Sequence, residues 1–308
     1  MLVSTAPAVL PEDAGGSPFD PRASIIGGFD DGPISHTISP NMDSTWAWIS
    51  AFEAGFPDRV LFENKILSIR GRRQGFSAMK PYIKIDESTM PDGTRYSLHK
   101  HAGEIYLKYN GCELMSTALT FSEQQLADIG CQTLLDGKPS RPAHPKILIG
   151  GLGLGFTLKR TLELVGSPAT VDVAELMPPL IEWNRTHLVE FNGPLLEDPR
   201  TVIIQGDLFD IVSNKKPGSY DALLLDIDNT PDDLITSGNA RLYSPGFLEK
   251  LRQVITPQGC VAYWLSEPAP KFKQLLVKGG FTVEEFASKQ HERAKRSRHC
   301  ILHAHRKS

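Results

Sequence analysis

Residues 146–156 read KILIGGLGLGF, an apolar segment followed directly by closely spaced glycines. The segment Lys146–Ile149 has the composition of a buried strand, and a helical pattern begins at Phe156. Glycines between a strand and a helix allow a tight turn and a close approach of the backbone to a ligand. The spacing is G-x-G-x-G rather than G-x-G-x-x-G, which disfavours a dinucleotide. We therefore expect a cofactor-binding turn here, with a plain tight turn as the alternative.

The chain continues after this turn as a regular alternation of apolar strands and amphipathic helices. Six further strands are expected over residues 170–175, 201–207, 221–228, 260–265, 282–287 and 299–304. Strands that are apolar throughout and alternate with helices are typical of a mostly parallel sheet covered on both faces. The sequence thus predicts an α/β fold, a doubly wound, seven-stranded, Rossmann-like sheet over residues 141–308.

The preceding part of the chain has a different character. Residues 1–45 are rich in Pro, Gly, Ser and Asp and predict a partly disordered extension. Residues 46–140 predict a smaller, β-rich N-terminal domain, in which Asn110-Gly111 marks a hairpin turn. Thr120-Phe121-Ser122-Glu123 fits a capping box at the start of a helix that would run to about Leu135.

Composition and charge exclude several classes of protein. The 308 residues carry a formal net charge of −3, which gives no overall attraction to nucleic acid or to anionic membranes. No apolar segment is long enough to span a bilayer, the start resembles no signal peptide, and the four cysteines form no C-x-x-C pair. These features predict a cytoplasmic protein with no membrane partner, an unlikely nucleic-acid partner and no metal.

Two acidic residues end strands near the glycine-rich turn. Glu175 ends the second strand, where a carboxylate can accept both hydroxyls of an adenosine ribose. Asp207 follows the third strand, where a carboxylate can accept the exocyclic amine of adenine. The alternatives are a solvated carboxylate for Glu175 and a helix N-cap for Asp207.

A cluster of polar residues ends the fourth strand. Asp226, Asp228 and Asn229 could orient and deprotonate an amine, and an Asx-rich turn is the alternative. The connection from 230 to 243 is long enough for a lid, and Tyr243, which closes it, is a weaker candidate for a catalytic role.

Together these motifs resemble the class I S-adenosylmethionine-binding fold and, within it, the spermidine synthase superfamily. The resemblance extends from about Gly103 to Trp264 and includes the segments ILIGGLGLGF, VDVAEL, QGDLFD and YDALLLDIDNTPD. It implies that the glycine-rich turn lines the methionine side of the cofactor, that Glu175 binds ribose and that Asp207 binds adenine. The implied cofactor-binding positions are Gly150, Gly151, Gly153, Gly155, Glu175, Leu176, Asp207, Leu208 and Asp226.

Departures from the superfamily pattern bear on the transferred group. Polyamine synthases typically carry an aspartate at the position of Gly153, where it holds the amine of the decarboxylated cofactor. Their helix motif D-E-x-x-Y-H-E begins here at Ser122-Glu123, with Leu126 and Ala127 in place of Tyr and His. Their second catalytic aspartate is Asn229 in this chain.

These departures favour a methyltransferase that uses S-adenosyl-L-methionine and acts on a small-molecule acceptor, for which an amine is the expected class. In this interpretation Asp226, with Asp228 or Asn229, orients the acceptor and receives its proton. The alternatives are a polyamine aminopropyltransferase that uses decarboxylated S-adenosylmethionine, and a nucleoside-binding protein without turnover. The resemblance also implies a possible homodimer.

Overall fold

The computed structural model describes residues 59–62, 65–68, 81–135, 142–227, 229–234, 237–289, 291, 294 and 296–307. The predicted extension over residues 1–45 and the candidate Asp228 lie outside these residues. The chain divides into two compact units, Met1–Phe76 and Ser77–Ser308. The first unit contains the antiparallel strands β1 (Arg59–Phe62) and β2 (Lys65–Ser68).

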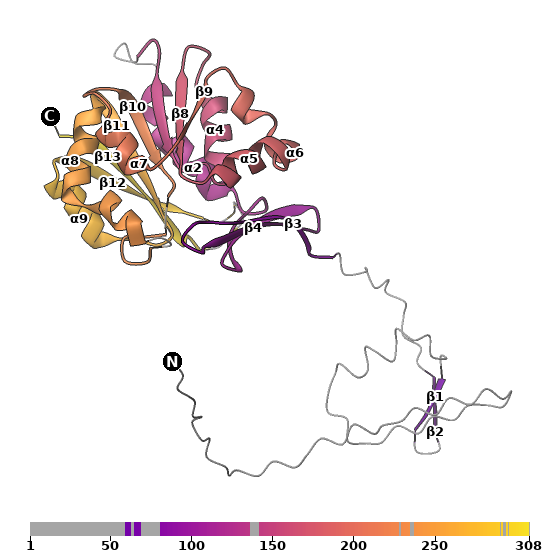
Figure 1. The fold of residues 1–308 in the computed structure, drawn as a ribbon. Coiled ribbons are helices and arrows are strands. Elements are labelled where there is room, and N and C mark those ends of the chain that lie inside the picture. Colours follow the sequence, from indigo (N-terminus) through magenta and orange to yellow (C-terminus); the bar gives the residue numbers. More distant parts are fainter. Residues whose placement is uncertain are drawn as a thin grey trace, which may run out of the picture. The chain divides into compact units, whose positions relative to one another are not determined.

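A seven-stranded sheet forms the centre of the second unit (Figure 1). Its spatial order is β12-β13-β11-β10-β7-β8-β9, and only β13 runs antiparallel to its neighbours. The strands are β7 (Lys146–Gly150), β8 (Thr170–Glu175), β9 (Thr201–Gln205), β10 (Tyr220–Leu225), β11 (Ile255–Leu265), β12 (Phe281–Ser288) and β13 (His299–Arg306). This mixed, doubly wound sheet confirms the fold expected from the alternating pattern.

Helices cover both faces of the sheet. Successive residues of a strand point to opposite faces, so each strand contacts both sets of helices. Ile147 and Ile149 pack under one set of helices, whereas Leu148 packs under the other. The first set is α2 (Phe121–Gly130), α3 (Gln132–Leu135), α4 (Phe156–Leu164) and α5 (Pro178–Thr186). The second set is α7 (Leu208–Ser213), α8 (Pro245–Val254) and α9 (Pro270–Lys278). Burial on both faces explains why the central strands β7 and β10 are almost entirely apolar.

A smaller antiparallel sheet contains β3 (Ile83–Thr89), β4 (Arg95–His101), β5 (Glu104–Tyr109) and β6 (Cys112–Ser116). Asn110 and Gly111 join β5 to β6 with positive φ angles of 48° and 86°, as the expected hairpin turn requires. Leu107 of this sheet shares a buried cluster with Leu154 and Trp183 of the larger part. The small sheet therefore packs against the glycine-rich turn and α5.

The start of α2 differs from the predicted capping box. Thr120 makes no side-chain bond to the helix backbone, and its hydroxyl accepts a hydrogen bond from the Gln124 side chain instead, at 2.9 Å. The Glu123 carboxylate accepts a hydrogen bond from the hydroxyl of Ser122, at 2.7 Å. The capping-box prediction was wrong, because the Thr120 hydroxyl bonds the Gln124 side chain rather than the helix backbone.

The short connections of the second unit are α6 (Val189–Asn192) and the 3₁₀ segments η1 (Leu195–Glu197) and η2 (Ser237–Tyr243). None of the helices in the described residues is long and apolar enough to cross a membrane. Of the four cysteines, Cys112 is exposed, whereas Cys131, Cys260 and Cys300 are buried. Burial raises the pKa of each of these three thiols to about 12.

Candidate active site

The candidate site lies where the order of the large sheet reverses. Strands β8 and β9 follow β7 on one side, whereas β10 and β11 lie on the other. At this point the backbone N–H of Asp226 donates to the carbonyl of Gly150, at 2.9 Å. Ligands of doubly wound sheets bind in the crevice at the carboxyl ends of the strands around such a reversal. The structure therefore brings the glycine-rich turn and Asp226 together, as the sequence predicted.

The glycine-rich turn needs glycine at two positions for steric reasons. Gly151 has a φ of 91°, and a Cβ there would lie 2.2 Å from the carbonyl oxygen of Asp226. Gly155 has a φ of 87°, and a Cβ there would lie 2.7 Å from the side-chain oxygen of Asn184. The side-chain amide of Asn184 donates to the Gly153 carbonyl, at 2.9 Å. The turn is thus held between α5 and the end of β10.

Glu175 anchors the turn to β8. Its carboxylate is buried and accepts hydrogen bonds from the backbone N–H groups of Leu152, at 2.9 Å, and Met177, at 2.7 Å. Burial raises the pKa of Glu175, while these backbone bonds oppose the shift. The backbone N–H groups of Gly153 and Leu176 also interact with this carboxylate, so backbone donors take up most of its about four lone pairs, and ribose binding by Glu175 stays a prediction. The neighbouring Leu176 is 52% exposed.

Asp207 has two partners in the structure. Its Oδ1 accepts a hydrogen bond from the backbone N–H of Phe209, at 2.8 Å, so Asp207 is the N-cap of α7. Its Oδ2 forms an ion pair with Arg241 of η2, whose guanidinium carbon lies 4.8 Å from the Phe209 ring centroid. Leu208 is buried in the core. The helix-cap interpretation describes Asp207 here, and adenine binding by Asp207 stays a prediction.

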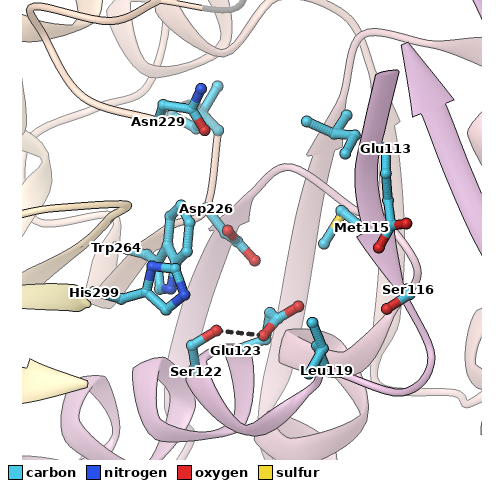
Figure 2. Close-up of a pocket in the computed structure, with 12 residues that line it drawn as sticks. Glu113, Met115, Ser116, Leu119, Ser122, Glu123, Asp226, Asn229, Trp264 and His299 are labelled. Carbon is cyan, nitrogen blue, oxygen red and sulfur yellow. Dashed lines mark hydrogen bonds between the residues drawn. The ribbon is translucent and has the colours of Figure 1, made fainter. Parts of the chain in front are cut away.

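A cavity of about 180 Å³ opens beside Asp226 (Figure 2). Side chains from both sheets and from α2 line it, among them Met115, Ser122, Glu123, Asp226, Trp264 and His299. Met115 also contacts the glycine-rich turn, because a Cβ at Gly153 would meet its sulfur at 2.9 Å. The cavity therefore adjoins the turn expected to bind the cofactor.

Besides the exposed Glu113, two carboxylates with raised pKa values face this cavity, one from α2 and one from the end of β10 (Figure 2). Burial raises the pKa of Glu123 to about 7, and the negative charge of Asp226 adds to the shift. Burial also raises the pKa of Asp226 to about 6, opposed by a hydrogen bond of 3.0 Å from the Thr157 hydroxyl. Two neighbouring carboxylates with raised pKa values favour a bound cation, which would relieve their repulsion. The cavity is chemically suited to an ammonium group.

The other predicted catalytic residues lie in different surroundings. Asn229 lines the cavity, and its backbone carbonyl accepts a hydrogen bond from Ser266, at 2.8 Å. Tyr243 is buried in the core, where its ring centroid lies 6.0 Å from that of Tyr263 and 5.0 Å from that of Phe272. The structure therefore places Asn229 beside Asp226, but it does not place Tyr243 in the cavity lining.

Sequence reasoning missed Met115, Glu123, Trp264 and His299 as residues of the site. Glu123 had a usable signal, because it matches the glutamate of the superfamily helix motif. Trp264 and His299 are brought together by the antiparallel pairing of β11 with β13, with ring centroids 4.9 Å apart. Within the described part of the chain, no three His, Cys, Asp or Glu side chains gather as metal ligands.

Comparison with known proteins points to one class. No family model matches the chain. Polyamine aminopropyltransferase 1 of Streptomyces coelicolor is 32% identical over 151 residues, covering 46% of this chain and 27% of that protein. Polyamine aminopropyltransferase of Saccharolobus solfataricus is 29% identical over 132 residues, covering 42% of this chain and 41% of that protein. The matches thus span less than half the length of these two curated relatives.

A solved structure agrees with these relatives at the level of the fold. Spermidine synthase from Thermotoga maritima superposes with a TM-score of 0.55 and 17% identity, covering 73% of each chain. The chain therefore has a class I S-adenosylmethionine-dependent transferase fold. Within that class, its fold is spermidine synthase-like.

Proposed function

We propose that the protein is an aminopropyltransferase, which moves the aminopropyl group of decarboxylated S-adenosylmethionine to an amine acceptor. The observation that carries this proposal is the pair Glu123 and Asp226, two carboxylates that face one cavity beside the glycine-rich turn. The names of the relatives, polyamine aminopropyltransferases, support the same activity. The proposal reverses the preference for methyl transfer drawn from the sequence.

The carboxylate pair attracts and orients the acceptor in this reaction. An amine enters as an ammonium ion, and the two carboxylates attract it out of water into the cavity. The hydroxyl of Thr157 holds one oxygen of Asp226 and so fixes the orientation of its carboxylate. When bound, the donor supplies an electrophilic carbon attached to a sulfonium. The protein then needs to hold the acceptor nitrogen in line with that carbon and to remove one proton from it.

The donor side of the site fits a nucleoside in part. The glycine-rich turn allows a close approach of the backbone to the donor, and the Glu175 carboxylate lies directly beside this turn, where it accepts from the N–H of Leu152. Asp207 is paired with Arg241, so an adenine amine would have to displace that guanidinium to reach Oδ2.

Methyl transfer from S-adenosyl-L-methionine is the second candidate, and one contact favours it. The space next to Gly153, where the superfamily pattern has a carboxylate for the donor amine, contains the sulfur of Met115. A thioether offers no counter-charge to an ammonium group. With glycine at position 153 and Met115 beside it, the site lacks the carboxylate that would favour the decarboxylated donor over S-adenosyl-L-methionine.

Calorimetric titration of the purified protein with both donors separates the two activities. We expect the decarboxylated donor to bind at least about tenfold more tightly, which corresponds to 1.4 kcal/mol. Incubation with 1,4-diaminobutane should then give a product heavier by one aminopropyl group. Preferential binding of S-adenosyl-L-methionine and a methylated product would instead establish the second candidate.

Asp226→Asn provides the site-directed test. The variant should lose turnover while it keeps most of its affinity for the donor. Asp232→Asn is the matched control, because Asp232 is an exposed carboxylate of the same acidic stretch outside the cavity lining. Equal activity of the two variants would contradict the role given to Asp226.

A further inference from the structure

His299 lines the cavity, and the carboxylate pair alone leaves it without a role in the proposed reaction. It is the first residue of β13, and its half-buried side chain lines the same cavity as Glu123 and Asp226. In Figure 2 the imidazole lies with Trp264 on one side of the cavity, and Glu113 and Met115 lie on the other. The Trp264 ring supports it, with centroids 4.9 Å apart.

A backbone contact fixes which nitrogen of this imidazole carries the proton. Nδ1 of His299 lies 3.1 Å from the carbonyl oxygen of Ser266. A carbonyl oxygen only accepts hydrogen bonds, so Nδ1 must be the donor. A neutral imidazole has one N–H, which leaves Nε2 as a proton acceptor. The backbone of Ser266 is held in position in turn, because its N–H donates to the carbonyl oxygen of Asn229, which lines the cavity.

Four charged side chains surround His299. Glu123 on α2, Asp226 after β10 and Glu113 on β6 line the cavity with it, and Arg298 precedes it in the chain. Burial lowers the pKa of His299, and Arg298 lowers it further, while the bond to Ser266 opposes the shift. Burial and Arg298 thus favour the neutral imidazole, the state in which it can accept a proton.

We propose that Nε2 of His299 is the base that deprotonates the amine acceptor, with Asp226 and Glu123 acting as its counter-charges. This inference rests on the proposed function and refines it. A carboxylate that took the proton would lose its charge while the attacking nitrogen becomes positive. A neutral imidazole takes the proton without that loss, and the resulting imidazolium is stabilised by the two carboxylates.

The step balances in atoms and charge. One N–H bond of the acceptor ammonium breaks, and the proton passes to Nε2 of His299. The lone pair of the neutral amine then forms a bond to the donor carbon. The carbon–sulfur bond breaks, and its electron pair stays on sulfur as a neutral thioether. The imidazolium releases its proton to solvent through the cavity mouth.

Nitrogen NMR of the full-length protein tests the proton-acceptor state without any turnover. In ¹⁵N-histidine-labelled protein at pH 7, the His299 signals should show a protonated Nδ1 and an unprotonated Nε2. Comparison with His299→Asn assigns these signals. Addition of 1,4-diaminobutane should shift the Nε2 signal more than the Nδ1 signal. A proton on Nε2, or no response to the diamine, would overturn the proposal whether or not the protein is an aminopropyltransferase.

Kinetics test the role in the reaction. His299→Asn keeps an amide donor for Ser266 but has no base, so kcat should fall by about 100-fold, the lower end for general-base catalysis. The KM for the amine should change by less than about threefold, because the carboxylates that bind it remain. The acid limb of the kcat–pH profile should also shift, because only the two carboxylates Glu123 and Asp226 then titrate in this range.

Chemical rescue separates a base from a structural residue. In His299→Ala, added imidazole should restore kcat at least about tenfold, because it can occupy the vacated space beside Trp264. His305→Gln, a change on the same strand outside the cavity lining, should keep kcat within about twofold and show no rescue. Full activity of His299→Asn would overturn the proposal, as would a folded His299→Ala that imidazole does not rescue. A wild-type protein without any transfer activity would instead refute the proposed function.

Discussion

The backbone carbonyl oxygen of Asp226 lies directly against Gly151, where an added Cβ would approach it to 2.2 Å. The turn that is expected to bind the donor and the carboxylate that is expected to bind the acceptor are therefore in van der Waals contact through their backbones. A change in one of these segments must displace the other.

Gly151→Ala tests this contact. The added methyl group meets backbone rather than a flexible side chain, and the φ of 91° disfavours any L side chain. We expect a loss of about 1–3 kcal/mol in the free energy of unfolding and a parallel loss of donor affinity. Urea denaturation and calorimetry measure both. Gly166→Ala is the control, because its Cβ would lie at an ordinary 3.5 Å from Pro168. Equal stability of the two variants would contradict the close approach.

Glu123 should make the stability of the protein depend on pH. Its pKa rises from 4.5 to about 7 on folding, so between these values the folded state binds more protons than the unfolded state. Stability is therefore lost as the pH rises through this window. The loss at pH 7.5 is on the order of 3 kcal/mol, as the size of the shift implies.

Glu123→Gln removes that titration. We expect the urea midpoint of the wild type to fall more steeply between pH 4.5 and 7.5 than that of the variant. Glu113→Gln changes an exposed carboxylate of the same cavity and serves as the control, with the wild-type slope retained. If the Glu123 variant keeps the full wild-type slope, its carboxyl group does not titrate as described.

Gly153→Asp with Met115→Ala should change the preference for the donor. The smaller side chain at position 115 removes the sulfur that a Cβ at Gly153 would meet at 2.9 Å. Aspartate tolerates the φ of 51° better than most residues, and its carboxylate would pair with the donor ammonium. We expect the affinity ratio of decarboxylated to intact S-adenosylmethionine to rise by about tenfold in calorimetry, or 1.4 kcal/mol. Met115→Ala alone should leave the ratio unchanged, and an unchanged ratio in the double variant would disprove this placement.

Arg241→Ala tests whether the guanidinium competes with adenine for Asp207. Removal of Arg241 frees Oδ2 of Asp207, and the pair is partly exposed. Such a pair contributes up to about 1 kcal/mol, so nucleoside affinity should rise about threefold to fivefold. Arg252→Ala removes an exposed arginine paired with Glu249 and should leave this affinity unchanged. Weaker nucleoside binding by Arg241→Ala would mean that Arg241 assists binding rather than competing with it.

Local patterns predicted the features that depend on neighbouring residues. The strand over 170–175 and the turn at Asn110-Gly111 follow from short-range rules. The position of Asp226 followed from the rule for strand ends in doubly wound sheets.

The missing parts of the site depend on contacts between distant segments. His299 lines the cavity because β13 pairs with β11, and no periodicity in the sequence indicates which strands pair. Arg241 reaches Asp207 from a 3₁₀ segment that was expected to be a lid. Glu123 was visible as a carboxylate, but its first-turn position fitted a helix cap as well as a binding site.

The distribution of the cysteines offers a way to observe the site by spectroscopy. Thiolates react with maleimides, and Cys131, Cys260 and Cys300 are both buried and held in the thiol form by pKa values of about 12. Cys112 is exposed and begins the strand that carries Met115 into the cavity. A single fluorophore should therefore attach to the unmodified native chain, close enough to report occupancy of the cavity as ligands enter and leave.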